Sequence, residues 1–220
     1  MEYRILGRTG LRVSAVALGC EGFIHKTPEE VCADFDFAIG HGVNFVDIYS
    51  PNPELRTNIG AALEGRRGDF VIQGHLCTTW ENGQYLRTRD PEKTLASFDL
   101  QLQQLRTDCL DIGMIHYVDA EADFHRVFGG EIIRIAQRLR EEGRIRHIGI
   151  SSHNPAVARM AVETGLVDVL MFSVNPCNRP ATTSRPCGPR RVTPARCATS
   201  TPTANGSTNC AKGRAWASTP

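Results

Sequence analysis

The chain alternates short apolar runs with longer segments in which apolar residues recur every three or four positions. The clearest apolar run is 109–119, CLDIGMIHYVD, with His116 near its downstream end. Its apolar residues follow one another almost without interruption: Leu110, Ile112, Met114 and Ile115. Such a run is typical of a strand that is covered on both faces of its sheet. Further strands are predicted over residues 13–19, 43–49, 70–76, 145–151 and 167–174.

The segments between these strands have the start and stop residues of helices. A capping side chain followed by proline, the typical start of a helix, occurs at Thr27-Pro28, Asp90-Pro91 and Asn154-Pro155. Glycines that can end a helix follow at positions 42, 65, 143 and 165. Between strands we therefore expect helices over about 28–41, 55–64, 91–106, 130–142 and 155–164. A turn that can close a hairpin is expected at Gly7–Gly10, and a polar loop over 77–89.

The regular alternation of strand and helix indicates an α/β fold with a parallel sheet. Two architectures accept it, an open doubly wound sheet and a closed (β/α)8 TIM barrel. The residues after the first predicted strand, GCEG at 19–22, lack the G-x-G-x-x-G turn of a nucleotide-binding open sheet. We therefore predict a TIM barrel that is incomplete, with about six strand–helix units in residues 1–177.

The composition changes abruptly after residue 177. Residues 178–220 contain seven basic residues and no acidic one, and they lack Leu, Ile, Phe, Tyr and Met altogether. Such a segment buries too little apolar surface to offset the entropy of ordering it, so we predict a disordered, basic, Pro/Thr/Arg-rich tail. The abrupt change favours translation in a shifted reading frame. A nucleic-acid-binding arm is less favoured, because the basic residues are scattered and lack interleaved aromatic side chains.

The overall composition is that of a globular protein, with 41% hydrophobic residues and a net charge of +1. No segment is long enough to span a membrane, and the N-terminus MEYRILGRTG has no apolar signal-peptide core, so we expect a cytoplasmic protein. In that compartment the eight cysteines are reduced thiols. They include no C-x-x-C pair, so no metal site is predicted.

Polar side chains that could do chemistry stand at the downstream ends of the predicted strands. Asp47 and Tyr49 end the second strand, His75 ends the third and His116 the fourth. In parallel α/β folds these carboxyl ends carry the active site. An acid, a phenol and two imidazoles at one barrel mouth suit the delivery of a proton to a developing oxyanion. Each residue taken singly is also explained by a structural role, such as a loop cap or a rim aromatic.

At these strand ends the chain resembles the aldo-keto reductase family. The resemblance is carried by YRILGRTGLRVSAVALGC at 3–20, GVNFVDIYS at 42–50, LDIGMIHYVD at 110–119 and IRHIGISSHNP at 145–155. It extends over about residues 1–177, roughly four-fifths of the chain. The chain looks most similar to bacterial members with a ferredoxin-like iron–sulfur extension, and nothing of that extension is present in the sequence.

The resemblance implies a catalytic tetrad of Asp, Tyr, Lys and His. Asp47 matches the aspartate and His116 the histidine, while Tyr49 is the only tyrosine near the position of the family's tyrosine. His75 stands where the family has its lysine, and would be a weaker, pH-dependent source of positive charge. For the cofactor, the family's nicotinamide-binding Ser-Asn pair corresponds to Ser151 and Ser152, and its glutamine on the sixth strand to Met171.

The resemblance therefore implies an oxidoreductase that uses NADP(H) to reduce the carbonyl groups of small aldehydes or ketones, with no nucleic-acid or membrane partner. The replaced lysine and the incomplete barrel predict that this copy is impaired. The main alternative is a non-catalytic barrel fragment. A lyase or aldolase on the same barrel is disfavoured, because no strand-end lysine is available for a Schiff base. The substrate, the choice between NADH and NADPH, and the oligomeric state stay open.

Overall fold

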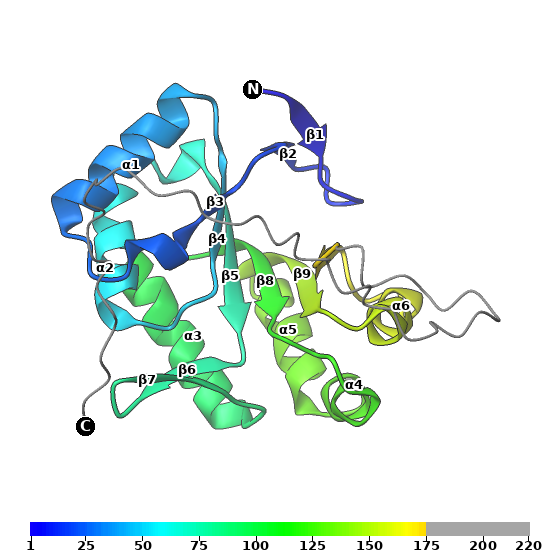
Figure 1. Cartoon of the computed structure of the whole chain (residues 1–220). Helices are drawn as coiled ribbons and strands as arrows, with labels where there is room; N and C mark the ends of the chain where they lie inside the picture. Colours follow the sequence, from blue (N-terminus) through cyan, green and yellow to red (C-terminus); the bar gives the residue numbers. More distant parts are fainter. Residues whose placement is uncertain (175–220) are drawn as a thin grey trace, which may run out of the picture. The chain divides into compact units, whose positions relative to one another are not determined.

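The computed structural model describes residues 1–174, in which six parallel strands form one curled sheet with helices packed against its outer face (Figure 1). The spatial order of the strands is β10-β9-β8-β5-β4-β3, so strands that follow one another in this sheet are also neighbours in space. The six strands are β3 (Leu18–Gly19), β4 (Phe45–Ile48), β5 (Val71–Leu76), β8 (Leu110–Ile115), β9 (Ile145–Ser152) and β10 (Val169–Phe172). This arrangement confirms the predicted partial barrel.

Helices connect successive strands, and three of the six α-helices in residues 1–174 begin at the predicted caps. The α-helices are α1 (Pro28–Gly40), α2 (Pro53–Ala62), α3 (Pro91–Leu105), α4 (Glu121–Phe128), α5 (Glu131–Glu141) and α6 (Pro155–Glu163), with 3-10 turns η1 (Cys20–Phe23) and η2 (Arg67–Asp69). The side chains of Thr27, Asp90 and Asn154 each accept a hydrogen bond from a backbone N–H in the first turn of their helix. These bonds satisfy donors that a helix start otherwise leaves unpaired.

Three sequence predictions need correction. The single strand expected over 13–19 is two strands, because β2 (Arg12–Ser14) pairs antiparallel with β1 (Tyr3–Ile5) through the Gly7–Gly10 turn, and only β3 joins the main sheet. The loop expected over 77–89 contains a hairpin of β6 (Thr78–Glu81) and β7 (Gln84–Arg87). Asn82 and Gly83 both have positive φ at its tip, as a tight hairpin requires. Helix α4 was not predicted at all.

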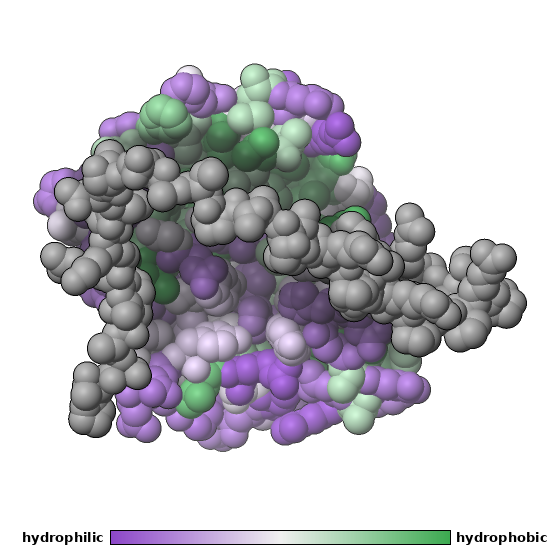
Figure 2. All heavy atoms as spheres, in the orientation of Figure 1, coloured by the Kyte–Doolittle hydropathy of each residue, from purple (hydrophilic) through white to green (hydrophobic). Residues whose placement is uncertain are grey.

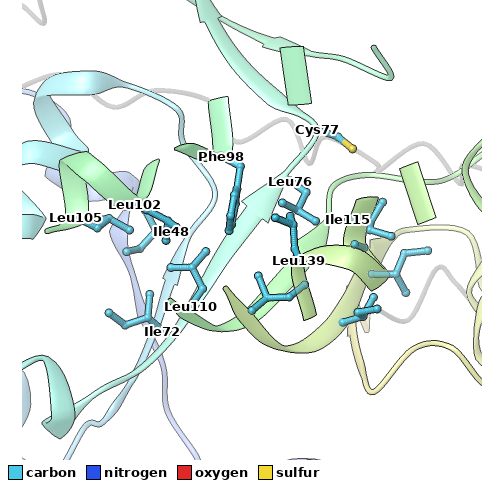
Figure 3. Close-up of a cluster of buried hydrophobic side chains, with 14 of the residues drawn as sticks. Ile48, Ile72, Leu76, Cys77, Phe98, Leu102, Leu105, Leu110, Ile115 and Leu139 are labelled. Atoms are coloured by element: carbon cyan, nitrogen blue, oxygen red, sulfur yellow. The ribbon is translucent and has the colours of Figure 1, made fainter. Parts of the chain in front are cut away.

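Two apolar clusters hold the described residues together. The larger one lies between the sheet and the outer helices, where Ile72, Leu76 and Leu110 of β5 and β8 meet Phe98 and Leu102 of α3 (Figure 3). The smaller one contains Ile112, Met114 and Val169, against which Leu6 and Leu11 from the N-terminal hairpin pack. A strand such as β8 is therefore buried on both faces, as its unbroken apolar run predicted.

The view in Figure 2 shows hydrophilic residues predominating along its lower edge, toward which the carboxyl ends of the strands point in Figure 1. Hydrophobic residues gather in its upper part, on the side of the N-terminal hairpin. Among residues 1–174, no helix is long and apolar enough to cross a membrane. The predicted disordered tail, residues 178–220, lies outside the described residues, so its prediction stays untested.

Candidate active site

The carboxyl ends of β4 and β5 bring a carboxylate and an imidazole together. Asp47 lies in β4 and His75 in β5, and His75 Nε2 is 3.1 Å from Asp47 Oδ1. Gln73, two residues before His75 on the same strand, donates to the same oxygen at 2.6 Å. Burial alone would raise the pKa of Asp47, but the hydrogen bonds and charge of His75 and the bond from Gln73 outweigh it, so the pKa is lowered. Asp47 is thus an anion at neutral pH.

A second imidazole extends this pair into a chain of three groups. His116 follows directly after β8, and its Nδ1 is 2.7 Å from Nδ1 of His75. At that distance the two nitrogens form a hydrogen bond, in which one carries the proton and donates and the other accepts. Burial, together with the charges of His75 and Arg89, lowers the pKa of His116 to about 3. His116 is therefore neutral at physiological pH, and its Nε2 is the nitrogen left for a ligand.

Tyr49 lies beside these imidazoles, but its hydroxyl is engaged elsewhere. The Tyr49 ring is stacked on His116, with centroids 6.0 Å apart and planes inclined by 9°. Its hydroxyl donates to Glu21 Oε1 at 2.8 Å. Burial and this bond to a carboxylate raise the pKa of Tyr49 to about 12. The structure thus brings all four predicted catalytic residues together, with the phenol directed to Glu21 rather than to Asp47.

The same residues line a pocket of about 240 Å³ at the carboxyl ends of the strands. The predicted cofactor-binding residues also line this pocket: Ser151 and Ser152 of β9 and Met171 of β10. Ser152 Oγ donates to Asp119 Oδ1 at 3.1 Å and is thereby occupied in the loop. Ser151 Oγ accepts from the Tyr117 backbone at 2.7 Å, which leaves its own proton available to a ligand.

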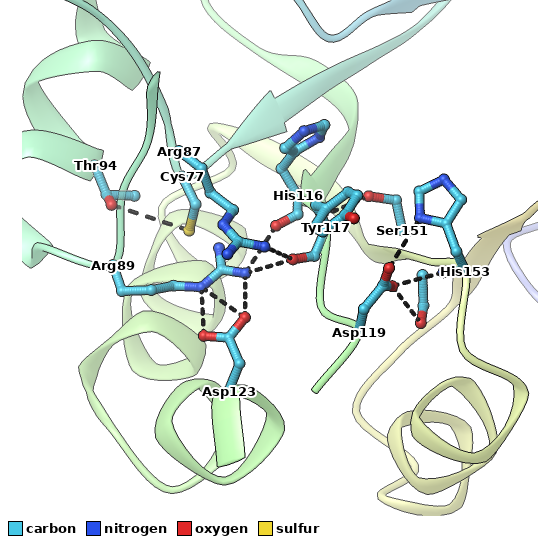
Figure 4. A network of polar contacts seen from close by, with 11 residues as sticks. Cys77, Arg87, Arg89, Thr94, His116, Tyr117, Asp119, Asp123, Ser151 and His153 are labelled. Carbon is cyan, nitrogen blue, oxygen red and sulfur yellow. Dashed lines mark hydrogen bonds and ion pairs between the residues drawn. The ribbon is translucent and has the colours of Figure 1, made fainter. Parts of the chain in front are cut away.

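Arg89, which no sequence pattern singled out, holds the segment after β8 in place (Figure 4). Arg89, in the connection from β7 to α3, donates through Nη2 to the carbonyl oxygens of His116 at 2.9 Å and Tyr117 at 2.8 Å. Its Nε and Nη2 also bind the Asp123 carboxylate of α4, at 3.0 and 2.7 Å. Tyr117 has a φ of +53°, which a non-glycine residue adopts at a cost. Arg89 therefore stabilises the backbone turn that presents His116.

Two further residues of the site were not predicted from the sequence. Gln73 was not among the predicted site residues, although alternation along β5 places it on the same face as His75. Glu21 lies in η1, after the first strand of the sheet, and no pattern linked it to Tyr49. Among residues 1–174, no group of three or more His, Cys, Asp or Glu side chains is arranged to hold a metal ion.

The curled parallel sheet carries an acid and two imidazoles at the carboxyl ends of its strands. This is where TIM-barrel enzymes have their active sites. The family is given by comparison: the aldo/keto reductase family matches residues 16–183, which is more than half of the chain. The chain belongs to the aldo/keto reductase family.

One curated relative is the uncharacterized oxidoreductase YqkF of Bacillus subtilis (strain 168), with 28% identity over 176 residues. The match covers 78% of this chain and 56% of the relative, so the chain spans about half of that relative's length.

Solved structures share the fold. A chain from Pseudomonas aeruginosa that is assigned to the aldo-keto reductases superposes with a TM-score of 0.71 at 24% identity, covering 80% of this chain and 69% of its own. Aldo-keto reductase AKR11C1 from Bacillus halodurans, in its holo form, superposes with a TM-score of 0.68 at 24% identity, covering 79% of this chain and 58% of its own. Both support the barrel architecture.

Proposed function

We propose that this protein is a cytoplasmic, NADPH-dependent oxidoreductase that reduces the carbonyl group of small aldehydes or ketones. The observation that carries the proposal is the hydrogen-bonded series Asp47–His75–His116, which ends in a pocket on the carboxyl side of the sheet. Family membership supports the reaction class. His75 stands at the position of the family's lysine and is a weaker source of positive charge. We therefore expect a rate of carbonyl reduction that is lower, and more dependent on pH, than with a lysine there.

The polar and apolar groups of the pocket residues suit a nicotinamide cofactor. The buried Ser151 hydroxyl has a proton to donate to a carboxamide oxygen. Met171, 43% exposed in the pocket wall, offers a polarisable apolar surface to a flat ring. Ser152 contributes by holding the loop at Asp119 rather than by direct binding. A nicotinamide cofactor bound beside Ser151 and Met171 supplies the hydride for reduction.

The source of the proton for the carbonyl oxygen follows from the tautomers that the two short histidine contacts permit. When His75 holds both ring protons, it donates to Asp47 through Nε2 and to His116 through Nδ1. His116 then carries its own proton on Nε2 and can donate it to the carbonyl oxygen as negative charge develops there. His75 passes its Nδ1 proton to His116 in the same step, which leaves His75 neutral. Asp47 orients His75 through the contact with its Nε2.

Tyr49 has a packing role in this scheme. Its hydroxyl is bound to Glu21 and holds its proton tightly, with a pKa of about 12. Its ring lies against His116 and limits the orientations that the imidazole can adopt. His116 is thus the residue proposed to touch the substrate oxygen, and Tyr49 one wall of the site.

Activity and cofactor binding are tested together on the full chain. We expect NADPH to bind saturably in a fluorescence titration and a small aldehyde to be reduced. His116→Ala should then lower kcat/KM by roughly 10²–10⁴-fold, the range for a positioned proton donor. His153→Ala is the matched control, because His153 lines the same pocket but is bound to Asp119 outside the series. His75→Lys should keep or raise the rate near pH 7 and flatten its pH dependence.

The outcomes also decide between the two candidate functions. Failure of a folded chain to bind NADPH would favour the non-catalytic barrel fragment. NADPH binding with an unchanged rate in His116→Ala would remove His116 from the mechanism but keep the reductase. Loss of all activity in His75→Lys would show that the imidazole has a role that a fixed positive charge cannot replace.

A further inference from the structure

A second cavity, of about 170 Å³, lies apart from the carbonyl-reduction site and shares no residue with it. It is lined by residues of α2, α3 and the β6 strand of the unpredicted hairpin. Apolar groups from Pro53, Trp80 and Leu100 form much of its wall. The polar groups include Arg56 of α2 and Gln104 of α3. The cavity is therefore an apolar space with a cation in its wall.

Arg56 is the unusual member of this wall. It is 1% exposed, and Nε donates to the Ser50 carbonyl oxygen at 2.9 Å. Nη2 is buried and has no hydrogen-bond partner among the described residues. A buried guanidinium is normally paired with a carboxylate, because taking an unpaired charge out of water is costly. No ion pair of Arg56 is formed within residues 1–174, so this charge is left without a counter-ion there.

The surroundings do not supply the missing negative charge. The residues that line the cavity include two cations, Arg56 and Lys93, and no carboxylate. Glu81 lies nearby, but it accepts a hydrogen bond from Lys93 Nζ at 2.8 Å and is thereby paired. Burial lowers the pKa of Arg56 to about 9, with no carboxylate opposing the shift. The guanidinium therefore still carries its positive charge at neutral pH.

Neighbouring amides do not resolve the imbalance either. Gln104 lines the cavity and its Oε1 is a buried acceptor without a partner. Rotation of its side chain could offer that oxygen to Arg56 Nη2, but an amide carries no net charge. Compensation of a buried cation requires an anion, and charge-assisted bonds of guanidinium to carboxylate are the strongest available pairing.

We propose that this cavity binds a small carboxylate with an apolar, single-ring or similarly sized body. The carboxylate would pair with Arg56, and the body would lie among Trp80, Pro53 and Leu100. A cavity of about 150 Å³ accommodates benzene, so a space of about 170 Å³ has room for one ring. The bound anion supplies the counter-ion that the Arg56 guanidinium lacks among the described residues. This site is independent of the carbonyl-reduction chemistry proposed above.

The test uses Trp80 as the reporter, because it lies in the cavity wall. Trp216 is the other tryptophan of the chain, so the full-length Trp216→Phe protein reports on Trp80 alone. Benzoate is the probe, benzamide is its neutral counterpart, and inorganic phosphate is an anion without an apolar body, all at constant ionic strength. We expect benzoate to change the Trp80 emission saturably, with a Kd of about 1 mM or tighter. Benzamide and phosphate should each bind at least about tenfold more weakly.

Two variants test the site in different ways, one by removing its charge and the other by filling its volume. Arg56→Met removes the charge and should weaken benzoate binding by about 10–100-fold, the range for a charge-assisted bond. Ala96→Phe fills the cavity from an exposed position of α3, so it should abolish the response even where Arg56→Met fails to fold. Arg134→Met is the control, since Arg134 is an exposed arginine on α5 paired with Glu131, and it should leave binding unchanged.

Several results would overturn the proposal. These are the absence of a saturable benzoate response at about 50 mM, equal binding of benzamide, and benzoate affinity that survives in a folded Arg56→Met or Ala96→Phe protein. Binding of phosphate without binding of benzoate would likewise reject the apolar carboxylate. Because Trp80 fluorescence needs no turnover, these results are separate from any failure of the reductase assay.

Discussion

Replacement of Arg89 by methionine should destabilise the protein and misplace His116 in one step. The Arg89 side chain is only 5% exposed, and its Nε and Nη2 bind the Asp123 carboxylate and the carbonyl oxygens of His116 and Tyr117 (Figure 4). Methionine has a similar apolar stem but no donor. The substitution therefore leaves the partly buried Asp123 carboxylate and the His116 carbonyl oxygen without this partner, while the Tyr117 carbonyl oxygen keeps its bond from Arg87 Nη1.

The expected loss follows from those contacts. Removing one member of a buried ion pair typically costs 3–5 kcal/mol, because the remaining charge stays desolvated. Asp123 is 19% exposed, so water can take over part of the role of Arg89. We therefore expect Arg89→Met to lower the free energy of unfolding by about 2–4 kcal/mol. Tyr117 should also relax from its positive φ, which would move the neighbouring His116 away from His75.

Urea denaturation followed by far-ultraviolet circular dichroism measures the loss of stability. Arg134→Met is the matched control: Arg134 and Glu131 are 67% and 59% exposed, so that pair should contribute less than about 1 kcal/mol. A loss in Arg89→Met no larger than in the control would refute the reasoning. The kcat of the variant, measured where it is still folded, should fall as well. An unchanged kcat would mean that Arg89 does not position His116.

Three further predictions concern the site and the sheet behind it. Gly74→Ala should cost about 1–3 kcal/mol of stability, because a Cβ there would lie 2.5 Å from Leu110 Cδ1 and 2.7 Å from Gln101 Nε2; an unchanged denaturation midpoint would contradict this. The folded-state pKa of His116, about 3, is below its usual 6.5, so in that interval the unfolded chain takes up a proton that the folded chain refuses. Stability should therefore fall as the pH is lowered from about 6.5 toward 3, and less steeply in His116→Gln; equal slopes in urea titrations across this range would argue against the shift. Tyr49→Phe should leave kcat/KM nearly unchanged, whereas a loss of about 10²-fold or more would make the phenol the proton donor.

The order of the elements was determined by the sequence alone. Unbroken apolar runs such as 110–115 cannot be placed on the surface, and a capping residue followed by proline, as at Asp90-Pro91, starts a helix for local reasons. These signals involve neighbouring residues, so they predicted six strands and five of the six α-helices in residues 1–174. The hairpin at Asn82-Gly83 also had a local signal, which was read as a loop.

The positions of Asp47, His75 and His116 could likewise be predicted, because parallel strands end at a common edge and each residue stands at or just after such an end. Their hydrogen bonds could not. The 2.7 Å contact between the two imidazoles and the bond from Tyr49 to Glu21 depend on side-chain directions set by packing across neighbouring strands and the η1 turn.

Only the tertiary structure decided the roles of Arg56 and Arg89. Both are arginines in polar stretches, which the sequence pattern would place at the surface. Arg56 is buried because α2 packs against α3, and the Arg89 side chain because it binds Asp123 of α4 and the carbonyl oxygens after β8. The energy of a charge depends on the solvent and the partners around it, and both are supplied by segments far away in the chain. One arginine thus holds a backbone turn, while the other lies unpaired in the wall of a cavity.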